Sequence, residues 1–248
     1  MRWRVVPIET HTASMAMAID EAVSEAVGRG ESPPTIRFWR WKPSAVSIGY
    51  FQSLEEEIDL DACARLGVDF VRRRTGGGAV YHDYEGEITY SVIAPEGVFP
   101  KDIIASYKII CGWIMDGLRR VGIESEFVPI NDIVVGGKKI SGNAQTRRGG
   151  VLLQHGTILY SVDVKKMFSL LKVPDEKVRD KMIKAVEERV TSVLNLRQVE
   201  REELVSALVA SFTAGKEFEF GGWSTWELAR ARELERSRYK TREWNFLR

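Results

Sequence analysis

Residues 72–83 read Arg-Arg-Arg-Thr-Gly-Gly-Gly-Ala-Val-Tyr-His-Asp, and this stretch is the strongest local signal in the sequence. A strand predicted at 69–73 runs straight into the three glycines, and strand character resumes at 79–81. Consecutive glycines adopt backbone conformations closed to other residues, and their bare N–H groups can form a nest for an anion. The arginines add positive charge suited to phosphate or carboxylate. We favour phosphate binding over the alternative, a glycine-rich turn beside solvated arginines.

A second motif, Gly-Gly-Lys-Lys-Ile-Ser-Gly-Asn-Ala-Gln, occupies residues 136–145. A hairpin turn at its first two glycines places Lys139 at the head of a strand, with Ser141 expected on the same face. A lysine there can neutralise a carboxylate and a phosphate that would otherwise repel each other. The alternative is an exposed, charged turn. A third motif, Gln-His-Gly-Thr at 154–157, lies in an apolar strand, where a lone histidine such as His155 is more often a core residue than a catalyst.

The predicted elements follow the order helix, strands, helix, strands and then helices. The expected helices are 13–27, 59–65, 101–121, 164–171, 175–186, 200–212 and 225–235, and the expected strands are 36–39, 45–50, 69–73, 79–81, 87–93, 127–128, 133–135, 139–141 and 151–160. This order favours an α+β fold with mixed or mostly antiparallel β-sheets flanked by helices, and it disfavours a regular βαβ alternation. We expect residues 1–248 to form a single domain, with the helical tail from about residue 164 packed on it.

The composition and the absence of known motifs exclude several classes of function. Lys and Arg number 36 against 35 Asp and Glu, so nothing indicates nucleic acid or an anionic membrane as a partner. No apolar segment has the length of a signal peptide or a membrane span, so we expect a cytoplasmic protein. Neither standard nucleotide-binding fingerprint is present. The histidines and the two cysteines, Cys63 and Cys111, show no metal-ligand spacing. A Ser–His–carboxylate site is not expected either, because the sequence has no Gly-x-Ser-x-Gly elbow.

Taken in order, the motifs resemble the lipoate–protein ligase A family, within the superfamily that includes biotin–protein ligases and lipoyl/octanoyl transferases. The resemblance also rests on Ala-Ile-Asp-Glu-Ala at 18–22, Pro-Thr-Ile-Arg-Phe-Trp-Arg-Trp at 34–41, Ser-Ile-Gly-Tyr-Phe-Gln at 47–52 and Glu-Trp-Asn at 243–245. It implies a biotin/lipoate–protein ligase-like catalytic domain that uses ATP and Mg²⁺ to convert lipoate to lipoyl-AMP, releasing pyrophosphate. The lipoyl group then passes to a lysine of an acceptor lipoyl domain, in an E2 subunit of a 2-oxoacid dehydrogenase or the glycine cleavage H protein.

The resemblance also implies which residues form the site, and Lys139 corresponds to the signature catalytic lysine. The expected ATP- and lipoyl-AMP-binding residues are Arg73, Thr75, Gly76, Gly77, Gly78, Ala79, Val80, Tyr81, Asp83, Lys139, Ser141 and Asn143. The expected lipoate-binding residues are Arg73, His82, Lys139, Gly142, His155 and Gly156. The ligands of the Mg²⁺ ion are not assigned.

Two alternatives to the ligase stay open. Residues 87–91, Glu-Ile-Thr-Tyr-Ser, resemble the cysteine-dependent octanoyltransferases, but residues 126–132, where those enzymes carry their nucleophile, contain no cysteine. We therefore expect a ligase, with an ATP-independent lipoyl/octanoyl transferase as the alternative and a non-catalytic lipoyl-binding protein as the second alternative. Because the chain ends soon after Glu-Trp-Asn, it is similar to archaeal bipartite ligases that lack the C-terminal accessory domain. A separate small accessory subunit is therefore expected as a partner.

Overall fold

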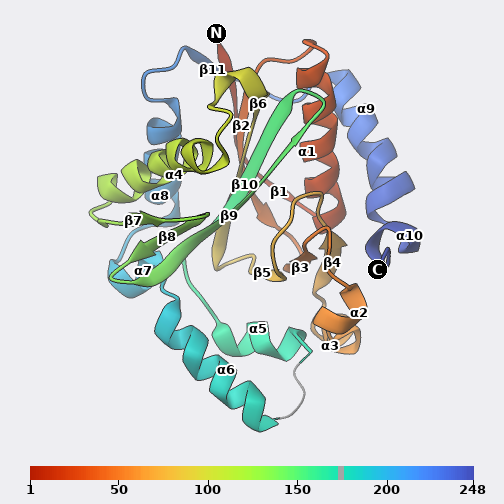
Figure 1. Ribbon diagram of the computed structural model, residues 1–248, viewed down its shortest axis with the longest axis vertical. Helices are drawn as coiled ribbons and strands as arrows, with labels where there is room; N and C mark the ends of the chain where they lie inside the picture. Colours follow the sequence, from red (N-terminus) through yellow and green to blue (C-terminus); the bar gives the residue numbers. More distant parts are fainter. Residues whose placement is uncertain (173–175) are drawn as a thin grey trace.

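An eight-stranded sheet and a three-stranded sheet form the centre of the computed structural model, which describes residues 1–172 and 176–248 (Figure 1). In spatial order the large sheet consists of β11 (Phe218–Phe220), β1 (Trp3–His11), β2 (Thr35–Trp41), β6 (Glu87–Pro95), β10 (Val151–Leu159), β9 (Lys138–Arg148), β8 (Asp132–Val135) and β7 (Glu126–Val128). The first three strands of this order are parallel, and the remaining pairs are antiparallel. This mixed sheet confirms the predicted α+β class.

Helices cover both faces of the large sheet. On one face, α4 (Ile103–Arg120) and α8 (Arg201–Thr213) pack against Ile88, Tyr90 and Val92 of β6 in the main hydrophobic core. On the other face, α1 (Ala13–Gly28) and α9 (Thr225–Leu234) pack against apolar residues of β2, β6 and β10. Figure 1 shows these two helix pairs on opposite sides of the sheet. No helix in the described parts of the chain is long and apolar enough to cross a membrane.

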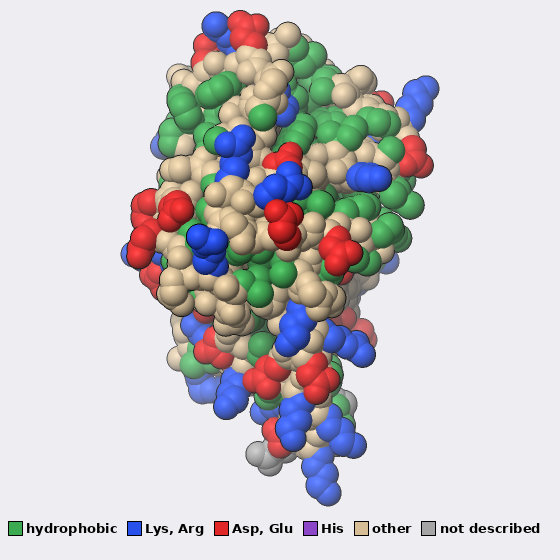
Figure 2. Space-filling view, turned by 90° about the vertical axis from the view of Figure 1, so that its left-hand side faces the viewer, with side chains coloured by type: hydrophobic (Ala, Val, Ile, Leu, Met, Phe, Trp, Pro, Cys, Tyr) green, Lys and Arg blue, Asp and Glu red, His purple; other side chains and the backbone are tan. Residues whose placement is uncertain are grey.

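The small sheet lies beside the lower part of the large sheet. It has the order β4 (Asp69–Arg72), β3 (Ala45–Ile48) and β5 (Val80–His82), and it packs with α2 (Leu54–Glu57) and α3 (Leu60–Leu66). Below both sheets lie α5 (Val164–Leu170) and α6 (Glu176–Arg189), which form the projecting end of the molecule (Figure 1). In the space-filling view this end is densely covered with Lys, Arg, Asp and Glu side chains (Figure 2). The remaining short helices are η1 (Glu96–Val98), α7 (Val193–Leu196), η2 (Glu235–Tyr239) and α10 (Arg242–Asn245).

Each predicted element corresponds to an observed one, but the short helices α2, η1, α7, η2 and α10 were not predicted. The sequence analysis assigned no strand to β1 or β11, and it predicted only 139–141 of the much longer β9. The first residue of the predicted helix 175–186, Asp175, lies outside the described residues, and α6 begins at Glu176. The predicted turn at Gly136–Gly137 is confirmed, because both glycines have positive φ (55° and 78°) between β8 and β9.

Strand alternation gives the large sheet one apolar face, under α4 and α8, and one face on which polar residues lie among apolar ones, here called the polar side. Ile88, Tyr90 and Val92 of β6 face the core beneath α4, so their neighbours Glu87, Thr89 and Ser91 face α1. In β10 the same rule turns Leu153 toward α1, and His155 follows two residues later. The polar side of the sheet therefore faces the region between α1 and the small sheet, where the candidate site lies.

Candidate active site

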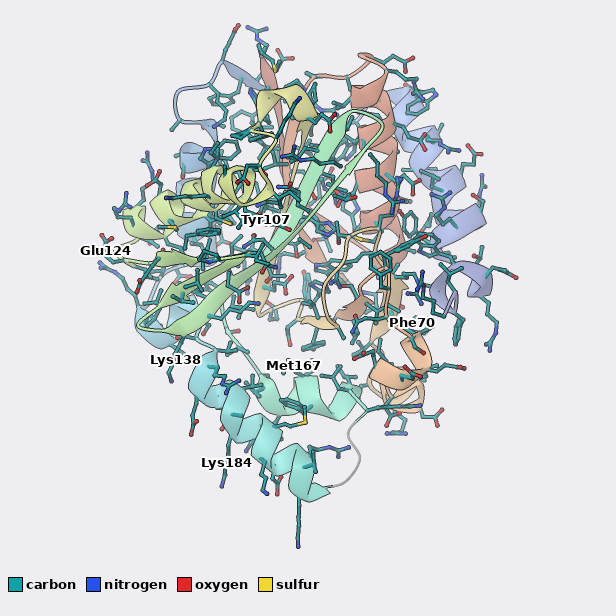
Figure 3. The ribbon with its side chains drawn as sticks, in the orientation of Figure 1. Phe70, Tyr107, Glu124, Lys138, Met167 and Lys184 are labelled. Carbon is teal, nitrogen blue, oxygen red and sulfur yellow. The ribbon has the colours of Figure 1, made fainter. Side chains whose placement is uncertain are left out.

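A cavity of about 330 Å³ lies between the polar side of the large sheet, the small sheet and the helices α5 and α6. Its volume lies in the range of small-molecule sites, ~300–1,000 Å³. Aromatic and aliphatic walls come from Trp39 and Trp41 of β2, Met167 of α5 and Val186 of α6. Figure 3 shows Met167 beneath the strands that form the upper walls. The cavity thus combines an apolar channel with polar strand residues.

Most of the predicted site residues line this cavity. They are Arg73, Gly77, Gly78, Ala79, Val80, Tyr81, His82, Asp83, Lys139, Gly142, Asn143, His155 and Gly156. Thr75, Gly76 and Ser141 do not line it. The hydroxyl of Thr75 lies 2.8 Å from Nε2 of His155, whereas the Gly76 carbonyl accepts a hydrogen bond from Arg73. The individual roles assigned to these residues stay predictions.

Arg73 places a buried guanidinium in the cavity wall. Its Nη1 donates to the carbonyl and hydroxyl oxygens of Ser47, at 3.1 and 3.0 Å. Its Nη2 donates to the carbonyls of Gly76 and Gly78, both at 2.8 Å. Burial lowers the pKa of Arg73 to about 10, so the group is still charged at neutral pH. No carboxylate in the described part of the chain pairs with Arg73. A buried charge without a counter-ion favours a ligand that carries or develops negative charge.

The glycine loop adds further hydrogen-bond donors to this wall. The backbone N–H groups of Gly77, Gly78 and Ala79 have no acceptor among residues 1–172 and 176–248. These three residues line the cavity, and Arg73 holds the loop from behind through its carbonyls. Free N–H groups are what an anion nest requires, and the expected nest stays a prediction.

The three consecutive arginines have different surroundings. Arg72 donates to the carbonyls of Tyr50, Gln52 and Trp244 and is buried away from the cavity. Arg74 forms an ion pair with Glu21 of α1, at 3.0 Å. Only Arg73 lines the cavity, because successive side chains at the end of β4 point in different directions.

Lys139 extends along the cavity from the start of β9. Its Nζ lies 2.7 Å from Oδ1 of Asp132, and its side chain is 41% exposed. A Cβ on Gly142 would lie 2.7 Å from Cε and 2.8 Å from Nζ of Lys139, so an alanine there would force the end of the lysine side chain to move. An irregular register between Ile133 and Val134 interrupts the strand alternation, and Ser141 therefore does not share the cavity-facing side with Lys139.

A chain of buried hydrogen bonds runs through His82. Its Nε2 lies 2.8 Å from Oγ of Ser47, and its Nδ1 lies 2.7 Å from Oε1 of Glu87. The imidazole ring stacks on Trp41, with centroids 4.0 Å apart. The hydroxyl of Thr89 donates to the same Glu87 oxygen at 2.5 Å. The sequence analysis expected no Ser–His–carboxylate arrangement. The three groups come from β3, β5 and β6 and meet only when the two sheets pack together, so the sequence did not show that they lie within hydrogen-bond distance.

His155 has a similar but separate set of partners. Its Nδ1 lies 3.0 Å from Oδ2 of Asp20, and its Nε2 contacts Thr75. Asp20 also accepts hydrogen bonds from Arg37 and Ser91, at 3.0 and 2.8 Å. These hydrogen bonds connect α1, β2, β6, β10 and the start of the glycine loop. His155 thus holds the loop against the large sheet.

Neither cysteine belongs to the site. Cys63 in α3 and Cys111 in α4 are buried, and neither lines the cavity. Burial raises the pKa of the Cys63 thiol to about 11 and that of Cys111 to about 12. Both thiols are therefore protonated and weakly nucleophilic near neutral pH.

Comparison with known proteins identifies the family. The model of the lipoyl protein ligase A/B catalytic domain matches residues 12–213. The chain belongs to this family.

Octanoyltransferase LipM of Brevibacillus brevis is 38% identical over 100% of this chain and 99% of its own length. Octanoyltransferase LipM of Geobacillus kaustophilus is 37% identical over 99% and 98%. A solved archaeal lipoylation system from Thermoplasma acidophilum, a bi-partite lipoate protein ligase and its E2 lipoyl domain, is 35% identical, with a TM-score of 0.89 over 99% of this chain and 96% of that one.

These relatives confirm the fold and the family but correct the predicted reaction. The expectation of an ATP-dependent lipoate–protein ligase is wrong, because curated relatives that match this chain over 98–99% of their own length are octanoyltransferases. The comparison favours the alternative, an enzyme of the lipoyl/octanoyl transferase type. Residues 87–91 already resembled the octanoyltransferases in the sequence. The prediction went astray because the missing cysteine at 126–132 excludes a thioester at that position but does not exclude acyl transfer.

Proposed function

We propose that the protein transfers a medium-chain acyl group, octanoyl or lipoyl, from a thioester donor to a lysine of an acceptor lipoyl domain, without ATP. The main support is the cavity, in which an apolar channel between Trp39, Met167 and Val186 adjoins the charged groups of Arg73 and Lys139. An acyl chain requires the channel, and the carbonyl at its head requires positive charge nearby. The similarity to octanoyltransferases supports the same reaction.

The reaction is chemically balanced without a nucleotide. A nitrogen–carbon bond forms between the acceptor amine and the acyl carbonyl, the carbon–sulfur bond breaks, and the thiol leaves with the proton that the amine gives up. Negative charge develops on the carbonyl oxygen as the amine attacks. In the proposed reaction, Lys139 and the N–H groups of Gly77 and Gly78, which all line the cavity, stabilise that charge.

The proposed partners are a carrier protein that supplies the thioester and a lipoyl domain that accepts the acyl group. The related Thermoplasma acidophilum ligase was studied together with its E2 lipoyl domain. The separate accessory subunit stays a prediction of the sequence. ATP and Mg²⁺, which were expected for a ligase, have no part in the proposed transfer.

The test uses the purified 248-residue chain, octanoyl or lipoyl carrier-protein thioester and an acceptor lipoyl domain, with no nucleotide. Mass spectrometry of the acceptor should show one added acyl group, and an acceptor whose target lysine is replaced by arginine should show none. A parallel reaction contains free lipoate, ATP and Mg²⁺. Acylation confined to this parallel reaction, accompanied by pyrophosphate, would overturn the proposal, as would binding of the acyl group without any transfer.

A further inference from the structure

Ser47, His82 and Glu87 form a continuous hydroxyl–imidazole–carboxylate chain, and all three residues line the cavity. The distances are 2.8 Å from Ser47 Oγ to His82 Nε2 and 2.7 Å from His82 Nδ1 to Glu87 Oε1. An ionised carboxylate only accepts hydrogen bonds, so Nδ1 carries the imidazole proton. Nε2 is then the acceptor for the hydroxyl proton of Ser47. Nucleophile, base and orienting carboxylate have the same order in serine acyltransferases and hydrolases.

The surroundings of Ser47 strengthen this reading. Arg73 Nη1 donates to Ser47 Oγ at 3.0 Å, so the oxygen already accepts one hydrogen bond from a cation and its own proton is free for His82. This cation stabilises negative charge on the oxygen as the proton leaves. The stacking of His82 on Trp41 holds the ring plane in line with both partners.

Glu87 is suited to stabilise a protonated imidazole. The residue is 1% exposed, and its Oε1 accepts from both His82 and Thr89. Its second oxygen, Oε2, is buried without a hydrogen-bond partner in the described residues. A buried carboxylate in this state is most favourable beside a positive charge. The imidazolium that forms when His82 accepts a proton supplies that charge.

The chain through His155 differs in two respects. In this chain the hydroxyl group belongs to Thr75, which does not line the cavity. An acyl donor in the cavity therefore does not contact this hydroxyl. Asp20 is already paired with Arg37 at 3.0 Å, so its charge is compensated before any proton moves. The Thr75–His155–Asp20 chain therefore positions the loop, whereas the chain through His82 is the one that can react.

The geometry points to Ser47 as the acyl-accepting nucleophile of the proposed transferase, with His82 as its base and Glu87 as the orienting carboxylate. Oγ of Ser47 attacks the thioester carbonyl while its proton passes to Nε2 of His82, and the carbon–sulfur bond breaks as His82 returns the proton to the thiol. The acceptor amine then attacks the Ser47 ester. Its proton passes through His82 back to Oγ as the carbon–oxygen bond breaks. This inference rests on the proposed function and supplies the nucleophile that neither cysteine provides.

The experiment first mixes the wild-type chain with octanoyl carrier-protein thioester in the absence of acceptor. Intact-mass and peptide mass spectrometry should find one octanoyl group on the peptide that contains Ser47. An oxygen ester resists neutral hydroxylamine and is cleaved by alkaline hydroxylamine, whereas a thioester is cleaved at neutral pH. The S47C variant should carry an adduct that has become labile at neutral pH, which assigns the atom that bears the acyl group.

Transfer rates with acceptor present complete the test. S47A should lose at least ~100-fold in rate, the lower end of what positioned acid–base groups contribute. Ser106→Ala is the matched control, because Ser106 is also a buried serine, bonded to the Ile103 carbonyl, but lies outside the cavity wall. It should transfer at the wild-type rate.

Three results would overturn the inference. If the wild-type chain and S47A transfer the acyl group from the thioester equally well, the proposed function stands but Ser47 is not the nucleophile. Loss of activity in S47A with no adduct on the wild-type or S47C chain would make Ser47 a positioning residue. If the wild-type chain does not transfer an acyl group from a thioester at all, both the proposed function and the assignment of Ser47 as nucleophile are wrong.

Discussion

Two adjacent lysines show how strongly the role of a residue depends on which atoms it reaches. Lys139 lines the cavity and lies along Gly142, whereas Lys138 is exposed and its Nζ lies 3.4 Å from the carbonyl of Glu187. Figure 3 shows Lys138 at the outer end of β9. The sequence analysis favoured a site lysine at 139 over an exposed turn, and the structure brings that residue to the cavity.

We predict that Lys139→Ala lowers the rate of acyl transfer at least ~100-fold, because one lost stabilising donor at a developing oxyanion costs that much. Lys138→Ala should transfer at the wild-type rate. Initial rates from acceptor mass spectra test both variants, and thermal unfolding checks that both are folded. A folded Lys139→Ala variant with near-normal transfer would show that the lysine does not contact the reacting carbonyl.

The second residue prediction concerns the thiols. With pKa values raised to about 11 and about 12 by burial, Cys63 and Cys111 remain protonated at pH 8. We expect iodoacetamide at pH 8 to leave both unmodified in the folded chain and to modify both after denaturation. A Cys63→Ala, Cys111→Ala double variant should keep its transfer rate within about twofold, although the lost core contacts cost ~1 kcal/mol or more in unfolding free energy. An acyl thioester recovered on either native cysteine would contradict this.

At the scale of elements, the sequence predicted the periodicity but not its consequence. The alternation of Ile88, Tyr90 and Val92 with polar neighbours is visible in the sequence, and it correctly indicates a strand with one apolar face. The sequence could not show that the polar face, with Glu87 and Thr89, forms a cavity wall. That outcome depends on the small sheet and α1 covering this side of β6, and these contacts join segments far apart in the chain.

Local irregularities limited the prediction in the same way. Period-two alternation placed Ser141 beside Lys139, but the register shift opposite Ile133 and Val134 separates the two side chains. A bulge of this kind depends on the partner strand, so the sequence of β9 alone does not reveal it. Ser47 was missed as a site residue for a related reason, because it comes close to His82 only when β3 pairs with β5 in the folded small sheet.

The glycine loop depends on a close backbone contact with Gly49, which directly follows β3, and this contact gives an element-scale prediction. A Cβ on Gly49 would lie 2.0 Å from the carbonyl oxygen of Gly77, a distance that backbone atoms cannot tolerate. Gly49→Ala must therefore displace the loop and with it the carbonyl contacts of Arg73. We expect a loss of at least ~100-fold in transfer, since small misplacements of reacting groups have effects of this size, together with a lower melting temperature.

Gly112→Ala is the control for this prediction. Gly112 lies inside α4, and an added Cβ would meet nothing within 4 Å. Alanine in a helix interior is favoured over glycine by ~1 kcal/mol, so the control should melt at a slightly higher temperature and transfer normally. Normal transfer by Gly49→Ala would show that the loop can shift without affecting the reaction.

At the scale of the whole molecule, the last residues of the chain hold the strand that precedes the glycine loop. Asn245 of α10 accepts a hydrogen bond from the backbone N–H of Arg72 at 2.8 Å, and its carbonyl accepts from the Arg72 guanidinium at 2.9 Å. The indole N–H of Trp244 donates to the carbonyl of Arg72, also at 2.8 Å. The end of β4, from which Arg73 enters the cavity, is therefore fixed by residues more than 170 positions away in the sequence.

The final prediction follows from this connection. Asn245→Ala leaves the buried N–H of Arg72 and two carbonyls, those of Tyr239 and Thr241, without their side-chain partner. An unsatisfied buried group costs ~1–3 kcal/mol, and each kcal/mol corresponds to roughly 2–4 °C in a protein of this size. We expect a melting temperature lower by several degrees and faster proteolysis of the C-terminal segment. Glu243→Ala, at an exposed neighbour in the same helix, should melt like the wild type.

Asn245 acts on the cavity only through β4, so the rate of transfer should decline as the end of β4 becomes less ordered. Hydrogen exchange at the backbone amides of Arg72 and Arg73 measures the order of this strand end directly. Unchanged exchange at these two amides in a variant of lower melting temperature would mean that α10 stabilises the fold without positioning Arg73.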